Sequence, residues 1–515
     1  MSSSLFVKKP LEALLAEARE EGAGTLHRTL GPINLVSLGI GAIIGAGIFV
    51  ITGTAAAQFS GPAIVLSFLL AAAACVFAGL CYAEFAALIP IAGSAYTYGY
   101  ATLGELVAWI IGWDLILEYA FGAATVASGW SGNIVSLLQD LGVPVPASLI
   151  GPPGTQLVYW QDRWQVLGSV AQALQAGGVD AATLPRATTL FDLPAFLVIA
   201  AVTALLVVGI RESAAFNAII VAVKVGTVLV FIAVVGTFLL QHPGIAWSNW
   251  RPFIPPNTGT FGEYGWSGIA RGAGVIFFAF IGFDAVSTAA QEARRPQRDM
   301  PVGILGSLLV CTVLYVLMGG LLTGIVDYRQ LNVAAPIALG IDATGVAWGS
   351  LLVKVGTFAG LSTTMLVMLL GQSRVLFTMS RDGLLPAWCS RVHPRFRTPW
   401  ISSIVVGMFV GLVAALLPIA TLGQLTSIGT LLAFVIVCGG VWALRRRRPD
   451  LHRPFRAPLV PLVPILGVVI SLGLMASLPL DTWLRLIAWL AVGLAIYLGF
   501  GRRHSAAARR EGAGM

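Results

Sequence analysis

Long apolar runs recur along the whole of this 515-residue chain and constrain its fold more than any other feature. About 20 apolar residues are needed to cross the roughly 30 Å of hydrocarbon in a bilayer as a helix. Within that layer only helices and closed barrels satisfy every backbone polar group. The sequence therefore predicts an all-α polytopic membrane protein with 12 transmembrane helices. The predicted spans are 32–53, 62–89, 102–138, 193–210, 214–240, 267–288, 301–326, 347–378, 400–418, 422–444, 459–479 and 482–500.

The composition agrees with a lipid-embedded chain. Hydrophobic residues make up 57% of it and charged residues 10%, whereas soluble proteins carry about 25% charged residues. The net charge of +8 could suggest a nucleic-acid partner. The cations, however, lie in short segments between apolar runs, which is the positive-inside pattern of a membrane protein. We therefore expect the lipid bilayer as partner and no nucleic acid.

The distribution of lysine and arginine predicts the orientation. The termini and alternate loops carry 23 cations, the opposite side carries 6, and 2 lie inside spans. This excess places both termini in the cytoplasm of a cell (inner or plasma) membrane. Residues 1–30 form a cytoplasmic segment with an amphipathic helix over Leu11–Glu21. The predicted domains are a core over 31–444, two further spans over 445–500 and a tail over 501–515, with a large external loop, lid or decoration, over 142–192.

Two spans contain glycines where a continuous helix is expected. The first reads GIGAIIGAGIFVITG over 39–53, and each interior glycine costs up to about 1 kcal/mol relative to alanine. Gly41 and Gly45 alone fit a close helix crossing equally well. The sixth span, however, carries Gly282 and Asp284 at mid-span, and interrupted spans at matching places in two repeats point to a transporter binding site. We therefore expect discontinuous helices 1 and 6.

The chemistry of such breaks suits a zwitterion. N–H groups at the start of a half-helix bind a carboxylate, and freed carbonyls accept from an ammonium group. For Asp284 we favour capping of the second half of span six over ligand contact. The predicted substrate-binding residues are Ile43, Gly45, Ala46, Gly47, Phe278, Ala279 and Ile281.

Two charged residues lie deep in the predicted spans. Lys224 is ten residues into span five, about 15 Å deep at 1.5 Å per residue, and Glu118 in span three lies at comparable depth. A membrane-buried ionisable pair can hand off a proton; the alternative is a static ion pair. Asp114, one turn from Glu118, fits the same network. Lys354 is close enough to a span end to have a structural role.

Other ionisable residues predict no catalytic or cofactor site. The five cysteines have neither metal-ligand nor disulfide spacing, and the five histidines lie in loops or tails. We expect no metal, no cofactor and no enzyme activity. Glu84, Glu105 and Asp299 fall near the predicted cytoplasmic boundary and suit gates or loop anchors.

Several strings resemble the cationic amino acid transporter family of the amino acid–polyamine–organocation (APC) superfamily. They are GAIIGAGIFV, CYAEFAALIPIAGSAYTYGYATLGELVAWIIGWDLILEYAFGAATVASGWSG, FFAFIGFDAVSTAAQEARRPQRDMP and GQSRVLFTMSRDGLLP. The resemblance covers most of residues 25–500 and is closest to bacterial members.

The resemblance implies a LeuT-type 5+5 inverted repeat with the substrate bound at helices 1 and 6. It implies proton coupling through Lys224 and its partner Glu118, and an outer gate at Phe278. It also implies a side-chain pocket that includes Leu361 and Ser362, where the bulk of Leu361 disfavours large cationic substrates. The expected function is amino-acid transport with a proton by symport and alternating access. An amino-acid or polyamine exchanger is the alternative; a channel or membrane enzyme fits less well.

Overall fold

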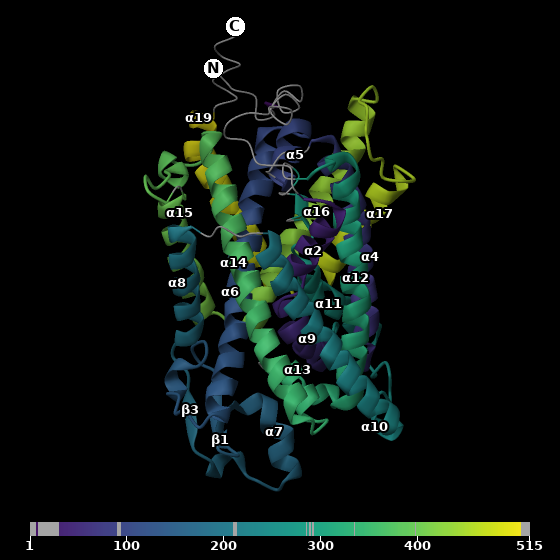
Figure 1. Ribbon diagram of the computed structural model, residues 1–515, viewed down its shortest axis with the longest axis vertical. Helices are drawn as coiled ribbons and strands as arrows, with labels where there is room; N and C mark the ends of the chain where they lie inside the picture. The colour runs from purple at the N-terminus through teal and green to yellow at the C-terminus, as the bar shows by residue number, and fades with distance from the viewer. Residues whose placement is uncertain are drawn as a thin grey trace.

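The structure is a computed structural model that arranges the chain as a tall bundle of helices (Figure 1). It describes residues 7–8, 30–89, 94–209, 214–284, 286–287, 290, 293–333, 335–396 and 398–505. The predicted helix over Leu11–Glu21 and most of the predicted tail lie outside these residues. We call the end with β1, β3 and α7 the sheet end, and the opposite end, with α19, the arginine end (Figure 1).

Seven continuous helical stretches in the described ranges are long and apolar enough to cross a membrane, and five shorter apolar helices accompany them. The seven long stretches correspond to α4 (Ile64–Leu88), α6 (Glu105–Asp140), α9 (Ala214–Gln241), α12 (Pro296–Ile325), α14 (Ala347–Arg381), α16 (Ile419–Arg447) and α18 (Leu480–Ile496). The five shorter helices are α2 (Pro32–Ile43), α8 (Leu193–Val208), α11 (Gly265–Ile276), α15 (Trp400–Leu416) and α17 (Leu462–Ser477).

Shorter elements connect or extend these helices. The first span continues as η1 (Gly47–Ile51), α3 (Thr52–Ala55), η2 (Ala56–Ser60) and η3 (Gly61–Ala63), and the sixth as η6 (Phe277–Phe280). The connections hold η4 (Ala147–Leu149), η5 (Ala181–Thr183), α10 (Pro243–Asn249), η8 (Tyr328–Gln330), α13 (Pro336–Asp342) and η9 (Ala387–Ser390), and η10 (Tyr497–Gly501) and α19 (Arg502–His504) follow α18.

The third predicted span begins later in the structure than the sequence indicated. The third span was predicted to begin at residue 102, but α5 (Ser94–Thr102) is a separate short helix and α6 begins only at Glu105. Gly104, with φ of 105°, makes the turn between them, in a backbone region that favours glycine. The hydrophobic run continues through this turn, so apolarity alone did not reveal it.

The loop predicted over 142–192 forms a small subdomain at the sheet end. Its strands β1 (Gln156–Trp160), β2 (Arg163–Val166) and β3 (Arg186–Thr188) form an antiparallel sheet in the order β2-β1-β3. The helix α7 (Leu167–Ala176) packs on it through Val158, Val170 and Leu174. Because this loop contains a sheet, the all-α prediction is wrong here. Asp192 then caps α8 by accepting from the Ala195 N–H.

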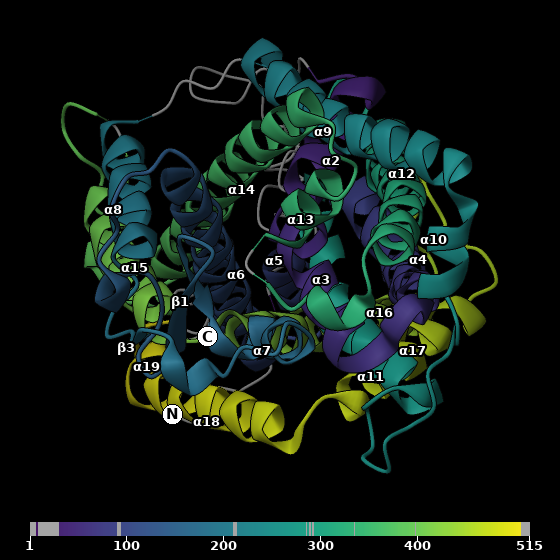
Figure 2. The ribbon, with the colours of Figure 1, turned by 90° about the horizontal axis from the view of Figure 1, so that it is seen from below.

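The helices pack in two flanks around the interrupted segments. Seen from the sheet end, α8 and α15 lie side by side on one flank, and α4 and α12 on the other (Figure 2). Between them α6 contacts α14 and α16, while α12 also contacts α2. Small residues allow close approach, as expected for helices in lipid: a Cβ on Gly122 of α6 would meet Met368 Sδ of α14 at 2.9 Å.

Candidate functional site

The first predicted interruption is present. α2 ends at Ile43, Ile44 adopts an extended conformation, and its N–H bonds to the Ile40 carbonyl at 2.9 Å. The chain resumes helical structure at Gly47. The N–H groups of Gly45 to Gly47 therefore lie at the start of a helical segment, where the helix dipole is positive. This is the position that we predicted for a carboxylate.

The second predicted interruption lies against the first. η6 ends at Phe280, Ile281 is extended, and Gly282 follows with φ of 113°. A Cβ on Gly47 would lie 2.2 Å from Ala279 Cα, so only glycine permits this contact between the two breaks. Ile43, Ala46, Phe278, Ala279 and Ile281 are all buried. The predicted substrate-binding residues are thus brought together in the interior.

A tyrosine that we did not predict bridges the two breaks. The Tyr315 hydroxyl of α12 lies 3.0 Å from the Ile43 carbonyl oxygen and 2.9 Å from the Ala279 carbonyl oxygen, so it can donate to either. Both carbonyls were predicted to accept from an ammonium group. A carbonyl oxygen has two lone pairs, so Tyr315 and an ammonium group can share it. The sequence signal that could have revealed Tyr315 is a single tyrosine hydroxyl within an apolar span.

Lys224 lies at the first break. Its Nζ donates to the Gly41 carbonyl at 2.6 Å and to Thr364 Oγ1 at 2.8 Å, and Thr364 in turn donates to the Ile44 carbonyl at 3.1 Å. The last carbonyls of a helix lack intrahelical partners and form its negative end. The lysine on α9 and the threonine on α14 therefore hold the C-terminal end of α2.

Glu118 lies elsewhere, among other acidic groups. Asp114 and Asp284 are its electrostatic neighbours, and Thr430 of α16 is its hydrogen-bonding neighbour. The Tyr119 hydroxyl donates to Asp284 at 3.3 Å. In the described part of the chain Glu118 makes no hydrogen bond or ion pair with Lys224. Equal depth in the bilayer does not bring the two together, since Lys224 is directed at the end of α2.

The predicted side-chain pocket borders the first break. Leu361 is fully buried on α14, and at the next residue Ser362 Oγ accepts from the Trp130 indole N–H at 2.9 Å. Trp130 also packs on Phe358 with ring centroids 4.7 Å apart. A Cβ on Gly360 would be 3.3 Å from Phe49. The surroundings of the break are thus mainly apolar, and Trp130 was not predicted.

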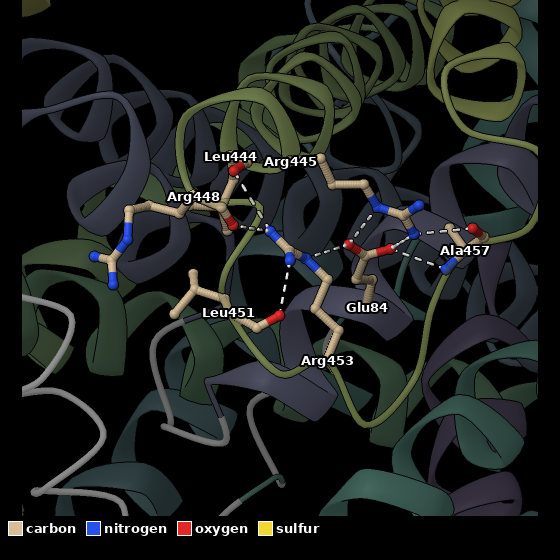
Figure 3. A network of polar contacts seen from close by, with 7 residues as sticks. All are labelled: Glu84, Leu444, Arg445, Arg448, Leu451, Arg453 and Ala457. Carbon is tan, nitrogen blue, oxygen red and sulfur yellow. Dashed lines mark hydrogen bonds and ion pairs between the residues drawn. The ribbon is translucent and has the colours of Figure 1, made fainter.

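Glu84, predicted as a boundary residue, is the centre of a buried network at the arginine end (Figure 3). Its Oε1 is 3.0 Å from Arg445 Nε and 3.3 Å from Arg453 Nε. Its Oε2 accepts from Arg445 Nη2 at 2.5 Å and from the Ala457 N–H at 2.8 Å. The α16–α17 connection is thereby fixed to the end of α4, as expected of a loop anchor.

The other boundary residues named from the sequence, Glu105, Asp299 and Lys354, also have structural partners. Glu105 accepts from the hydroxyls of Tyr100 at 2.7 Å and Tyr497 at 3.0 Å. Asp299 accepts from the Arg295 N–H at the start of α12, and Lys354 pairs with Asp342 at 3.1 Å. Among the described residues no three His, Cys, Asp or Glu side chains are grouped so as to hold a metal ion.

Comparisons with known proteins agree with this geometry. Residues 30–496 match the family model described as amino acid permease. Over 506 residues the chain is 43% identical to the branched-chain amino acid permease BcaP of Bacillus subtilis, covering 98% of this chain and 99% of that protein. It is 42% identical to the methylthioribose transporter of the same organism, with the same coverage.

A plant relative is more distant. The vacuolar cationic amino acid transporter 4 of Arabidopsis thaliana is 36% identical over 433 residues, which are 84% of this chain and 66% of that protein. The resemblance to the APC superfamily is thereby confirmed. The relatives are transporters and not enzymes.

Proposed function

Since this chain belongs to the amino acid permease family, we propose that it carries amino acids across the plasma membrane as a proton-coupled symporter. The single observation that supports this most strongly is the contact between two broken helices, with a buried lysine at one break. Broken helices of this kind form the midplane site in secondary transporters. The arrangement that we propose is a 12-helix, LeuT-type 5+5 inverted repeat.

In this proposal the backbone at the breaks binds the substrate's head group. The carboxylate binds the N–H groups of Gly45, Ala46 and Gly47. The ammonium group binds the carbonyls of Ile43, Phe278, Ala279 and Ile281, two of which are positioned by Tyr315. Both termini face the cytoplasm, with the arginine end inside.

Lys224 couples the proton to the movement of α2. While charged, it holds the negative end of α2 against α9 and α14 through Gly41 and Thr364. Release of its proton removes the charge–dipole attraction, so the half-helix is free to move relative to α14. Glu118, which lies apart from Lys224 on α6, takes part in the same transport step, and Phe278 forms the outer gate. Alternating access then follows from the movement of the half-helices relative to α6 and α14.

The substrate that fits best has a medium-sized apolar side chain. The bulk of Leu361 and the aromatic ring of Phe49 border the break, and a large cationic side chain would be poorly accommodated there. The relatives named as branched-chain permeases, 43% and 35% identical, support this choice. The 42% identical methylthioribose transporter makes methylthioribose the second candidate.

Competition for uptake tests the proposal. In proteoliposomes with an imposed pH step, radiolabelled leucine should accumulate, and valine and isoleucine should compete with it. Leucinamide and the deaminated acid of leucine should not, because each lacks one charge of the head group. Competition by leucinamide equal to that of leucine would contradict backbone recognition of the carboxylate. Uptake of methylthioribose without leucine uptake would favour the second candidate.

A further inference from the structure

A cavity of about 400 Å³ lies at the sheet end, where α6 ends and α14 begins. Figure 2 shows α6, α13 and α14 from this end. The apolar wall of the cavity includes Leu137, Leu141, Val346 and Leu351. The charged residues that line it are Asp342 at the end of α13 and Lys354 on α14. A mainly apolar cavity with a few converging polar groups is typical of a small-molecule site.

The two charges suit the two ends of an amino acid. Lys354 Nζ is 3.1 Å from Asp342 Oδ2, and the side-chain exposed fractions are 17% and 45%. The first turn of α14, at Val346 and Ala347, forms another part of the wall and adds the positive end of a helix. The cavity therefore offers a positive region for a carboxylate and a negative group for an ammonium ion. The leucine side chains offer a surface for an apolar side chain.

The cavity lies in the same helix contact as the proposed transport site. α6 and α14 are antiparallel, because Trp130 contacts Ser362 while Gly112 lies against Met379. Along α14, Lys354 precedes Thr364 by ten residues, which is about 15 Å of helix. Thr364 is the residue that binds Lys224 at the first break.

An aromatic pair separates the two sites. Phe358 lies one turn after Lys354 on α14, and Trp130 of α6 packs on it with ring centroids 4.7 Å apart. The hydrogen bond from Trp130 to Ser362 fixes the indole over the predicted side-chain pocket. A molecule that moves from the cavity to the break along this contact must displace these two rings.

We propose that this cavity is an outer binding site, which receives a zwitterionic amino acid with an apolar side chain before the substrate passes Trp130 and Phe358. The proposal rests on the proposed function as an amino-acid transporter. The substrate carboxylate binds Lys354 and the first turn of α14, while its ammonium group binds Asp342. The incoming zwitterion thus replaces the ion pair between Lys354 and Asp342.

Cysteine protection tests the site without requiring transport. The five native cysteines are buried, so a membrane-impermeant thiol reagent should report on Leu141→Cys, at a side chain that is 69% exposed. Saturating L-leucine should slow its labelling. Lys354→Met in the same background should weaken leucine binding there about tenfold, as expected when a hydrogen bond to a charged group is lost.

Two controls define the outcomes. Leu190→Cys, exposed in the sheet-end subdomain and outside the cavity, should label at the same rate with and without leucine. Equal protection at both cysteines, or protection that survives Lys354→Met, would overturn the proposal. If phosphatidylethanolamine vesicles slow labelling of Leu141→Cys and leucine does not, the cavity binds a lipid head group and the proposal fails.

A kinetic asymmetry provides an independent test. Lys354→Met should raise the KM for leucine uptake into intact cells about tenfold and leave the maximal rate unchanged. The KM measured from the other face, in inside-out vesicles, should stay at the wild-type value. An equal shift at both faces, or no shift, contradicts an outer site. A wild-type protein that transports no amino acid refutes the proposed function. In that case the labelling of Leu141→Cys still decides whether leucine binds in the outer cavity.

Discussion

Glu84 and Glu118 are both buried glutamates on long helices, yet their surroundings differ. Each oxygen of Glu84 has two partners, from Arg445, Arg453 and the Ala457 backbone (Figure 3). By contrast, Oε1 of Glu118 and both carboxylate oxygens of Asp114 have no hydrogen-bond partner in the part of the chain that the structure describes. One acid is enclosed by cations; the other lies among acids.

This difference separates a brace from a group that can exchange a proton. A buried carboxylate with two arginines is held as an ion and stabilises the elements that supply them. An ionised carboxylate with unpaired oxygens in an apolar interior costs several kcal/mol, so Glu118 and Asp114 call for a bound proton. Glu84 therefore fixes the α16–α17 connection, and the surroundings of Glu118 support the role in proton transfer that we propose for it.

Replacement of Glu84 should have the largest effect on stability. Glu84→Gln leaves the buried Arg453 and the partly buried Arg445 without their anion, which costs about 3–5 kcal/mol and corresponds to a melting temperature about 3–5 °C lower in detergent for a chain of this length. The matched control is Asp450→Asn, since Asp450 pairs with Arg448 at the exposed surface and such pairs contribute about 0–1 kcal/mol. A Glu84→Gln protein that melts like the control would show that the network is not a brace.

Glu118→Gln should have the opposite profile. The amide has nearly the same shape and loses no ion pair, so the melting temperature should stay within about 2 °C of the wild-type value. Proton-driven accumulation of leucine should be abolished, because the amide cannot carry a proton. A large drop in melting temperature with normal accumulation would make Glu118 a second brace.

Lys224 and Glu118 should act in one transport step although they do not touch. Lys224→Met should also abolish proton-driven accumulation while leucine binding persists. The double variant should then be little worse than either single variant, since groups that act as a unit are non-additive. Losses that add independently would separate the two residues, and Asp114 would become the next candidate.

Thr364 and its neighbour Thr363 provide a finer test at the break. Thr364→Val keeps the side-chain shape but removes the hydroxyl that binds Lys224 and the Ile44 carbonyl. Loss of a hydrogen bond to a charged group should lower kcat/KM for leucine about tenfold. Thr363→Val, whose hydroxyl bonds within its own helix, should remain near the wild-type value. Equal losses would place the effect in α14 itself.

Tyr315→Phe should have the smallest effect of these changes. It removes the hydroxyl shared by Ile43 and Ala279 but keeps the ring, so the loss of about 0.5–1.5 kcal/mol should raise the KM for leucine about three- to tenfold. Tyr159→Phe, in β1 of the sheet-end subdomain, is the control and should leave KM unchanged. An unaltered KM in Tyr315→Phe would show that the hydroxyl does not position the ammonium site.

Much of the fold followed from hydrophobicity and glycine placement. Each predicted span overlaps a helix, and both breaks lie where Gly45 and Gly282 indicated. These features were predictable because the length of an apolar run and the lack of a side chain at glycine determine the local backbone conformation. The sheet within 142–192 was missed, since its short strands of three to five residues carry a weak periodic signal.

The parts of the site that depend on which helices are neighbours were harder to predict. Depth follows from 1.5 Å per residue, so Lys224 and Glu118 were expected at one level. The side of the helix and the partner helix do not follow from depth, and Lys224 proved to bind Gly41 and Thr364. The position of Tyr315 between the breaks depends in the same way on the packing of α12 against α2.

The central claim is that a proton, acting through buried groups, drives amino-acid transport. The most direct measurement is leucine uptake into proteoliposomes with an imposed pH step, with and without sodium, for the wild-type protein and Lys224→Met. We expect wild-type accumulation that follows the pH step and ignores sodium, and no accumulation above equilibrium by Lys224→Met. Uptake that requires sodium and ignores the pH step, or normal proton-driven accumulation by Lys224→Met, would contradict the claim.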